Sequence, residues 1–356
     1  MIALTEPVVA PAAKLAVESR HGELHQDWNE YVAAHPAATL FHLSAWKRVI
    51  ERAFGFEPRY MVAKRGGEIC GVLPLFLAAN WIQGRTLISS PFAVYGGILA
   101  SDEEARQALC QAACRMAVED KVQYLELREP HSPLGSELQT KNLYVTFEQE
   151  LPSDPALLLK QLPKDTRYMI RKGQKAGLRT VKGNDQLGPL HDIYAHSVRH
   201  LGTPVFAKRY FKILLEEFGN AAETTVIWNG NAAVAAVLSF RFRDQILPYY
   251  GGSLVEARAL AANNFMYWEV LRDACERGIR RFDFGRSKLG TGSYTFKSQW
   301  NMQERPLPYQ FYLANRKTLP NFSPVNPRFR LAIDIWKKMP IPVTKTFGPA
   351  LVKLFP

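Results

Sequence analysis

Residues 223–252 read ETTVIWNGNAAVAAVLSFRFRDQILPYYGG and carry the strongest fold signal of the chain. Two apolar runs, Glu223 to Trp228 and Ala233 to Arg241, flank Asn229-Gly230-Asn231. Such a tripeptide favours a tight turn between antiparallel strands. A third run, Gln245 to Tyr250, follows a short polar break. The stretch therefore predicts a meander of three strands.

The chain beyond this meander predicts a helix and then a fourth strand. Residues 263–277 place Phe265, Trp268 and Leu271 on one side of a helix, and Gly278 fits its C′ position. Residues 281–284 form a short charged strand. The second half of the chain is thus expected to be an α/β domain with a largely antiparallel sheet.

The first half repeats this order. Strand-like segments at 59–64, 69–77 and 85–89 include a Gly66-Gly67 turn, and they precede Tyr95-Gly96-Gly97. A helix over 102–119, with Ser101 as its N-cap, and a strand at 124–128 follow. Tyr250-Gly251-Gly252 has the same place in the second half, about 155 residues later. A repeat at that separation indicates a domain duplication.

This duplication divides the chain into four parts. We expect a flexible, Ala/Pro-rich leader at 1–24, domains at 25–152 and 153–315, and a basic amphipathic tail at 316–356. The Pro-Ser-Asp-Pro sequence near residues 151–155 is the expected linker. The tail alternates apolar residues with Lys and Arg, so it either lies on an anionic membrane or packs on the protein as a helical cap.

Composition limits the classes of function. The formal net charge is +12. This excess indicates either an anionic partner or simply a basic protein surface, and the charge alone does not decide between the two. The four cysteines form no CxxC pair, and no His, Cys or carboxylate motif predicts a metal site. The N-terminus does not resemble a signal peptide, and no apolar run is long enough to cross a bilayer, so a cytoplasmic location is expected. No nucleophilic triad, P-loop or zinc-finger spacing is present.

Three segments could carry chemistry. Residues 162–178, LPKDTRYMIRKGQKAGL, place several cations along one helix, suited to a phosphate group or to a solvated face. Residues 200–204, HLGTP, form a turn between two helices that could line a pocket. Residues 282–300 join a charged strand end to a Gly-rich loop and then to Lys297, which is flanked by aromatic side chains. Such a lysine could neutralise an oxyanion in a partly dry site, or it could be a surface lysine whose stem packs on aromatics.

At these segments the chain resembles the FemAB/FemX-like family of tandem GNAT-type acyltransferases. LPKDTRYMIRKGQKAGL is similar to the basic signature of that family, and YTFKSQW at 294–300 is similar to its Phe-Lys motif. The HLGTP stretch resembles a subgroup associated with PEP-CTERM/exosortase and exopolysaccharide systems. The resemblance covers residues 25–315 and is strongest over 160–305. It implies two tandem GNAT-like domains, each a mixed, largely antiparallel sheet flanked by helices.

The resemblance also implies a function. Members of the family transfer an aminoacyl group from aminoacyl-tRNA to an amine on a peptidoglycan precursor, and GNAT relatives use acyl-CoA. We therefore expect transfer of an acyl or aminoacyl group to an amine on a cell-envelope or exopolysaccharide precursor, with no bound cofactor. The donor, aminoacyl-tRNA or acyl-CoA, stays open, although residues 251–262 lack the Q/RxxGxG/A loop of CoA-binding relatives. The alternative is a catalytically degenerate protein that binds a phosphorylated or lipid-linked precursor.

Site residues follow from the motifs and from the resemblance. Lys297, by its place in the Phe-Lys motif, would stabilise the oxyanion, and Asp283 would position the amine or a proton-carrying water. The expected substrate-binding residues are Arg167, Arg171, Lys172, Thr203, Tyr250, Arg286, Tyr294, Phe296 and Trp300. The expected partners are a phosphate-bearing or lipid-linked precursor, aminoacyl-tRNA and the anionic inner face of the cytoplasmic membrane.

Overall fold

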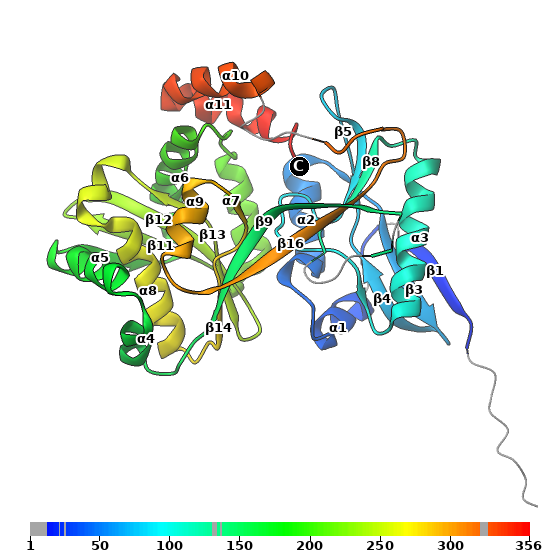
Figure 1. Cartoon of the computed structure of the whole chain (residues 1–356), viewed down its shortest axis with the longest axis horizontal. Coiled ribbons are helices and arrows are strands. Elements are labelled where there is room, and N and C mark those ends of the chain that lie inside the picture. Colours follow the sequence, from blue (N-terminus) through cyan, green and yellow to red (C-terminus); the bar gives the residue numbers. More distant parts are fainter. Residues whose placement is uncertain (1–12, 21, 25, 130–133, 136, 321–326) are drawn as a thin grey trace, which may run out of the picture.

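The structure is a computed structural model, which describes residues 13–20, 22–24, 26–129, 134–135, 137–320 and 327–356 (Figure 1). Residues 1–12 and 21 of the expected leader lie outside the described residues, as do residue 25 of the expected first domain and residues 321–326 of the expected tail. The leader prediction is wrong for Leu15–Arg20, which is strand β1 and pairs with β3. The pairing gives these backbone groups partners in a sheet.

The first half folds around a four-stranded antiparallel sheet in the order β1-β3-β4-β7. Its remaining strands are Tyr60–Arg65 (β3), Glu68–Leu73 (β4) and Leu99–Ala100 (β7). The helices of this half are Gln26–Ala34 (α1), Ser44–Phe54 (α2) and Glu103–Glu119 (α3). The short strands Glu57–Pro58 (β2), Phe76–Asn80 (β5), Gly84–Ile88 (β6) and Tyr124–Leu127 (β8) belong to the larger second sheet.

The second half repeats this plan. Strands Arg179–Lys182 (β10), Ala222–Asn229 (β11), Ala232–Phe242 (β12) and Gln245–Ser253 (β13) are antiparallel neighbours. Helix Ala262–Glu276 (α8) and strand Arg281–Asp283 (β14) follow, as α3 and β8 follow β7. The flanking helices are Pro155–Gln161 (α4), Lys164–Lys175 (α5), Leu187–Leu201 (α6) and Lys208–Phe218 (α7). The predicted fold class, largely antiparallel sheets flanked by helices in a repeated order, is confirmed.

Two long strands that the sequence analysis did not predict join the halves. Strand Gln139–Glu150 (β9) pairs with β14, and strand Gln303–Tyr312 (β16) pairs with both β9 and β8. The second sheet therefore runs without interruption from β10 in one half to β2 in the other. Figure 1 shows β9 and β16 crossing the centre of the molecule. Strand β14, which carries the expected site residue Asp283, is thus connected to the first half through the backbone hydrogen bonds of β9, β16 and β8.

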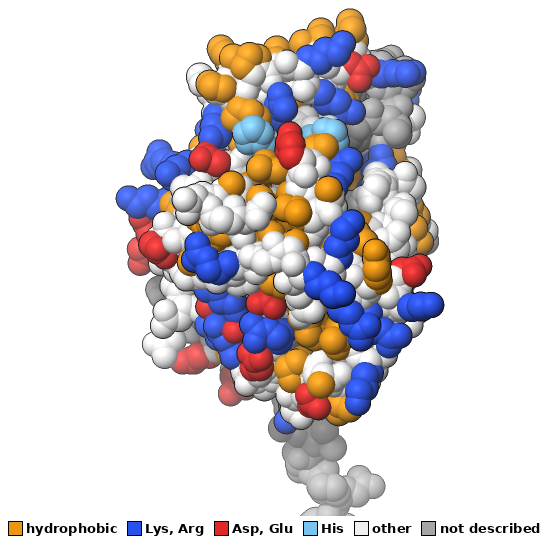
Figure 2. Space-filling model, turned by 90° about the vertical axis from the view of Figure 1, so that its left-hand side faces the viewer, with side chains coloured by type: hydrophobic (Ala, Val, Ile, Leu, Met, Phe, Trp, Pro, Cys, Tyr) orange, Lys and Arg blue, Asp and Glu red, His pale blue; other side chains and the backbone are white. Residues whose placement is uncertain are grey.

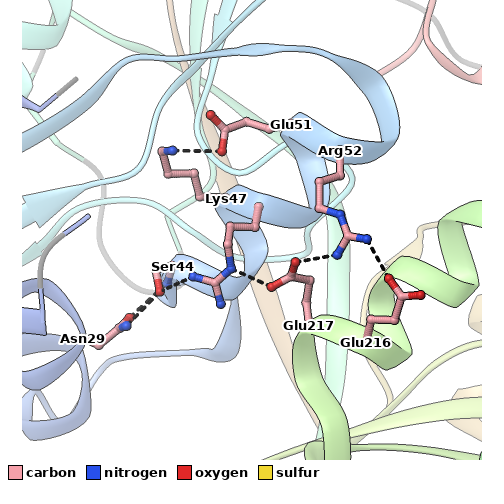
Figure 3. Close-up of polar contacts among 8 residues, drawn as sticks. Asn29, Ser44, Lys47, Glu51, Arg52, Glu216 and Glu217 are labelled. Atoms are coloured by element: carbon pink, nitrogen blue, oxygen red, sulfur yellow. Dashed lines mark hydrogen bonds and ion pairs between the residues drawn. The ribbon is translucent and has the colours of Figure 1, made fainter. Parts of the chain in front are cut away.

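Ion pairs between α2 and α7 make a second connection between the halves (Figure 3). Glu217 accepts hydrogen bonds from Arg48 Nε at 2.6 Å and from Arg52 at 2.7 Å. Arg52 also reaches Glu216 at 2.6 Å. Beneath them, Trp46 of α2 packs on Phe218 of α7 with ring centroids 6.2 Å apart. The largest hydrophobic core likewise draws its side chains from both halves.

The tail folds into helices Pro327–Lys338 (α10) and Ile341–Val352 (α11), which both pack on α6. Trp336 is buried, and its indole nitrogen donates to the Thr203 carbonyl at 3.0 Å. Gly348 lies so close to Val205 that a Cβ would meet the Val205 carbonyl oxygen at 2.6 Å. One face of the tail is therefore a cap on the protein.

Small differences from the sequence predictions have local causes. Helix α3 is capped by Asp102, whose carboxylate accepts from the Ala105 amide at 2.8 Å, and not by Ser101. Gly278 takes a φ of +71° after α8, as its C′ assignment requires.

Within the described residues, none of the helices combines the length and the apolar character needed to span a bilayer. The same residues contain no cluster of His, Cys, Asp and Glu able to hold a metal ion.

Candidate active site

The turn after β14 organises the candidate site. Gly285 has a φ of +67°, which a residue with a Cβ rarely adopts, so the chain can reverse directly after Phe284. The Gly285 amide donates to the Asp283 carboxylate at 2.7 Å. Asp283 is fully buried and also accepts from Tyr95 Oη at 2.7 Å and Gln245 Nε2 at 3.3 Å. A further bond from the Thr146 hydroxyl completes this set. The buried carboxylate thus holds the turn in place through its bond to the Gly285 amide.

Lys297 holds the same turn through the backbone carbonyl groups of that turn. It lies on helix Gly292–Ser298 (α9), whose N-cap Thr291 accepts from the Tyr294 amide. The Lys297 Nζ donates to three consecutive carbonyls, those of Phe284 at 2.6 Å, Gly285 at 2.9 Å and Arg286 at 3.3 Å. These three bonds match the three donors of an ammonium group.

Burial makes Lys297 easier to deprotonate than an ordinary lysine. The side chain is 8% exposed, and this burial lowers the pKa of Lys297 to about 8. The negative charge of Asp283 acts in the opposite direction and raises the pKa, while nearby Arg286 lowers it further. A cation in a poorly solvated site interacts strongly with any charge that develops beside it.

Two pockets meet at Lys297. The first, the lysine pocket, has a volume of about 390 Å³ and is lined by residues of both halves and of the tail, among them Phe92, Thr203, Tyr249, Arg286, Lys297 and Phe355. The second, the helix pocket, has a volume of about 450 Å³ and is lined by the start of α8 and the end of α6. The two pockets share Tyr267, Ser293 and Lys297. Two molecules could therefore approach the same ammonium from different sides.

The wall of the lysine pocket is aromatic. Phe206 stands 5.5 Å from Tyr250 between ring centroids, and Tyr249 stands 4.6 Å from Tyr250. The Tyr250 hydroxyl is 2.8 Å from the Tyr210 hydroxyl, and burial raises the pKa of Tyr250 well above its usual value. Arg286 is exposed in this pocket, and its guanidinium lies 4.7 Å from the Tyr144 ring centroid. The pocket thus combines apolar walls with two cations, Arg286 and Lys297.

The helix pocket suits an anionic group. Helix α8 begins at Ala262 without a side-chain cap, and Asn263 and Asn264 line the pocket beside that helix end. Arg258 and His200 line it too, with 3.3 Å between Arg258 Nη2 and His200 Nε2. Free amides at a helix N-terminus and a guanidinium both favour negative charge.

The structure brings together five of the predicted site residues. Lys297, Thr203, Tyr250 and Arg286 line the lysine pocket, and Phe296 lines the helix pocket. Asp283 lies beneath the turn and does not line either pocket, which differs from the expectation that it contacts the amine. Its bond to the Gly285 amide makes it a residue that positions the turn.

The other predicted residues lie elsewhere. Arg171 and Lys172 are exposed on α5, and neither lines the two pockets, nor does Arg167, whose guanidinium donates to the Lys160 carbonyl at 2.8 Å. Trp300 is 1% exposed and packs in the core. Tyr294 donates to Glu304 at 3.0 Å, away from the pockets.

Sequence reasoning missed residues that tertiary structure brings to the pockets. Phe92 and Val94 come from the first half, and Val352 and Phe355 come from the tail. Arg258 was overlooked although it stands inside the quoted 251–262 stretch. A basic residue just before a helix start was a usable signal for an anion site.

Part of the chain matches a known protein family. Residues 160–298, which include α5 to α9 and Lys297, match the acetyltransferase (GNAT) domain family. No curated protein sequence matches the chain significantly.

Among solved structures, FemX superposes with a TM-score of 0.64 at 15% identity, covering 89% of this chain and all of FemX. The C-terminal domain of a putative lysylphosphatidylglycerol synthetase from Agrobacterium fabrum gives 0.53 at 13% identity, covering 76% of this chain and 86% of that one. A tandem GNAT protein from the clavulanic acid biosynthesis pathway gives 0.52 at 12% identity, covering 86% and 100%. Residues 160–298 are therefore similar to the GNAT domain family, and the chain has the fold of FemX and of tandem GNAT proteins.

Proposed function

We propose that this protein transfers an acyl or aminoacyl group to an amine on a cell-envelope or exopolysaccharide precursor. The observation that carries the proposal is the position of Lys297, a buried ammonium at the junction of two pockets. One pocket would hold the donor and the other the acceptor, so that the reacting atoms meet beside the cation. Holding two reactants in this way supplies much of the acceleration when no covalent nucleophile takes part.

The reaction needs only the groups at this junction. The acceptor nitrogen forms a bond to the carbonyl carbon of the donor, and the carbonyl oxygen becomes an oxyanion beside Lys297. The bond to the leaving group then breaks, and the amine proton passes to that leaving group, so that a thiolate becomes a thiol or a ribose alkoxide becomes a hydroxyl. For Lys297 to reach the oxyanion, one of its bonds to the 284–286 carbonyls is exchanged for it.

The helix pocket would receive the anionic end of the donor. Arg258, His200 and the uncapped start of α8 suit the phosphates of acyl-CoA or the 3′ end of aminoacyl-tRNA. The lysine pocket would then take the acceptor, with Arg286 for its negative groups and the aromatic wall for its apolar parts. FemX and the lysylphosphatidylglycerol synthetase domain share the fold, which fits acceptors of the envelope class.

A second candidate is a binding protein without turnover. It is favoured by the bonding of Lys297, whose three donors are already engaged by backbone carbonyls. In that case the pockets would hold a phosphorylated or lipid-linked precursor.

A transfer assay separates the two candidates. Purified protein is incubated with labelled acyl-CoA or aminoacyl-tRNA and with amine-bearing precursors, and the labelled amide is measured. Amide formation that depends on Lys297 supports the enzyme. Binding of the precursor without any labelled amide from either donor would favour the binding protein.

A further inference from the structure

The tail helix α10 has two apolar faces, and only one of them packs on the protein. Trp336 and Ile333 face α6, where Ile333 lies against Gly202. Leu331 and Ile335, one helical turn apart, are 72% and 48% exposed. Among the residues that the structure describes, these two large aliphatic side chains take no part in a core.

Neighbouring elements add to this exposed apolar surface. Phe347 of α11 is 60% exposed, while Gly348 and Val352 of the same helix are buried. The turn between β5 and β6 carries Trp81, which is 84% exposed, and Asn80 beside it donates to the Leu354 carbonyl at 3.4 Å. Figure 1 shows this turn and both tail helices at the same upper edge of the molecule. We call these four exposed residues, Trp81, Leu331, Ile335 and Phe347, the tail face.

Positive charge surrounds the tail face. Residues 327–353 contain six Lys or Arg and one acidic residue, the exposed Asp334. Lys338 and Lys353 are exposed, and Lys345 is paired with Asp192 at 2.5 Å. In Figure 2, apolar side chains gather at the top of the molecule with Lys and Arg next to them.

We infer that the tail face docks on the surface of an anionic lipid bilayer. Leucine, isoleucine and phenylalanine on an amphipathic helix enter the boundary between headgroups and acyl chains, and tryptophan favours the same depth. The flanking lysines are attracted to anionic headgroups. RNA would use the lysines but would leave the aliphatic side chains without a partner, so a bilayer fits the whole surface better.

Docking would bring the candidate active site close to the lipid. Val352 and Phe355, at the end of the tail, line the lysine pocket, and the Arg128 guanidinium holds the Pro356 carbonyl oxygen at 3.0 Å. Helix α11 therefore carries both Val352, which lines the lysine pocket, and Phe347 of the tail face.

Vesicle co-sedimentation of the full chain tests the docking. The protein should bind phosphatidylcholine vesicles with about one third phosphatidylglycerol, bind pure phosphatidylcholine much more weakly, and be released by salt. The double variant Leu331→Ser/Ile335→Ser should lose about tenfold or more in partitioning. Changing Lys338 and Lys353 to Glu should weaken partitioning into the anionic vesicles by roughly fivefold or more for each lysine changed.

Matched controls lie on and just after helix α3 of the first half, outside the tail face. Val118 on α3 is 55% exposed, and Lys121 just after that helix is exposed as well. Val118→Ser and Lys121→Glu should leave vesicle binding unchanged. Circular dichroism and thermal melting confirm that each variant is folded, which is expected because every changed side chain is solvent-exposed.

Several outcomes would overturn the inference. These are no binding to either vesicle, equal losses in the control variants, or capture of tRNA through the lysines without vesicle binding. A dimer seen by light scattering without vesicles, and abolished by Leu331→Ser/Ile335→Ser, would make the face a contact between copies. Lys297→Met should still bind vesicles, so a failure of the transfer chemistry and a failure of docking are separate results.

Discussion

Tyr95 of the first half donates a 2.7 Å hydrogen bond to the Asp283 carboxylate at the end of β14 in the second half. Both side chains are buried, and burial raises the pKa of Tyr95 well above its usual value, so the phenol stays protonated as the donor. Asp283 in turn accepts from the Gly285 amide, in the turn whose carbonyls bind Lys297. The first half therefore helps to set the geometry of the candidate site.

The first prediction concerns this bond. Tyr95→Phe removes one partner of a buried carboxylate and should lower the free energy of unfolding by about 1.5–3 kcal/mol. Turnover should fall as well, because the turn that holds Lys297 loses one of its constraints. Urea unfolding and a kcat measurement check both effects.

A matched control is Tyr31→Phe, whose hydroxyl donates to the Cys70 carbonyl at 3.0 Å, a bond made within the first half. Tyr31→Phe should lower the free energy of unfolding without changing kcat. Equal kcat losses in both variants would mean that Tyr95 acts only through global stability.

The second prediction concerns Lys297 itself. Lys297→Met keeps most of the side-chain volume and removes the charge, so turnover should fall on the order of a hundredfold if the ammonium stabilises an oxyanion. Affinity for the acceptor, measured by calorimetry, should change little, because the cation acts mainly in the transition state. Near-normal turnover in a folded variant would exclude Lys297 from the chemistry.

The third prediction is a pH profile. Burial lowers the pKa of Lys297 to about 8, and the mechanism needs the charged form. Turnover should therefore be highest below pH 8 and should fall as the pH rises through about 8. Lys297→Arg keeps its charge at high pH. Whatever its absolute rate, its profile should lack this descending limb, and a limb at the same pH in the arginine variant would assign the titration to another group.

Local signals were enough to predict the repeated core of the fold. The Asn229-Gly230 turn and the alternation of strands and helices depend on neighbouring residues only, and β11, β12, β13 and α8 follow them closely. Strands β9 and β16 were missed because their partners lie in distant parts of the chain. Pro306 and Pro308 inside β16 also weaken the strand signal.

The candidate site shows the same division. Lys297 could be proposed from its aromatic neighbours, and the structure places it at the junction of two pockets. Arg171 and Lys172 were proposed from the charge of their segment and from its resemblance to a family signature, and they face solvent, as runs of charge usually do. Phe92 and Phe355 could not be found in this way, since only tertiary packing brings them within reach of Lys297.

The fourth prediction concerns the ion pairs between the halves. Glu217 is 11% exposed and accepts from Arg48 and Arg52. Glu217→Gln should lower the free energy of unfolding by about 1 kcal/mol and should reduce its dependence on salt. The more exposed Glu216 is the control, because Glu216→Gln should have a smaller effect.

The pH dependence of this pair has a defined sign. Partial burial acts to raise the pKa of Glu217, but the hydrogen bonds from Arg48 and Arg52 outweigh it and lower the pKa. The stabilisation is therefore present above the pKa of an unfolded glutamate and is lost as the pH falls through the lower pKa of the folded state. If the unfolding curves of Glu217→Gln and the parent chain differ equally at every pH, the pairing contributes nothing through charge.

The fifth prediction separates the two pockets. Arg258 lines the helix pocket beside the start of α8, and Arg286 lines the lysine pocket. If the helix pocket takes the anionic end of the donor, Arg258→Ala should raise the KM for the donor about tenfold and leave the KM for the acceptor unchanged. Arg286→Ala should raise the KM for the acceptor and leave the KM for the donor unchanged.

Initial rates measured over a range of both substrate concentrations give the two KM values for each variant. If Arg258→Ala raises the acceptor KM instead, the donor and the acceptor occupy the opposite pockets. The assignment then has to be exchanged, because the shared ammonium of Lys297 serves either arrangement.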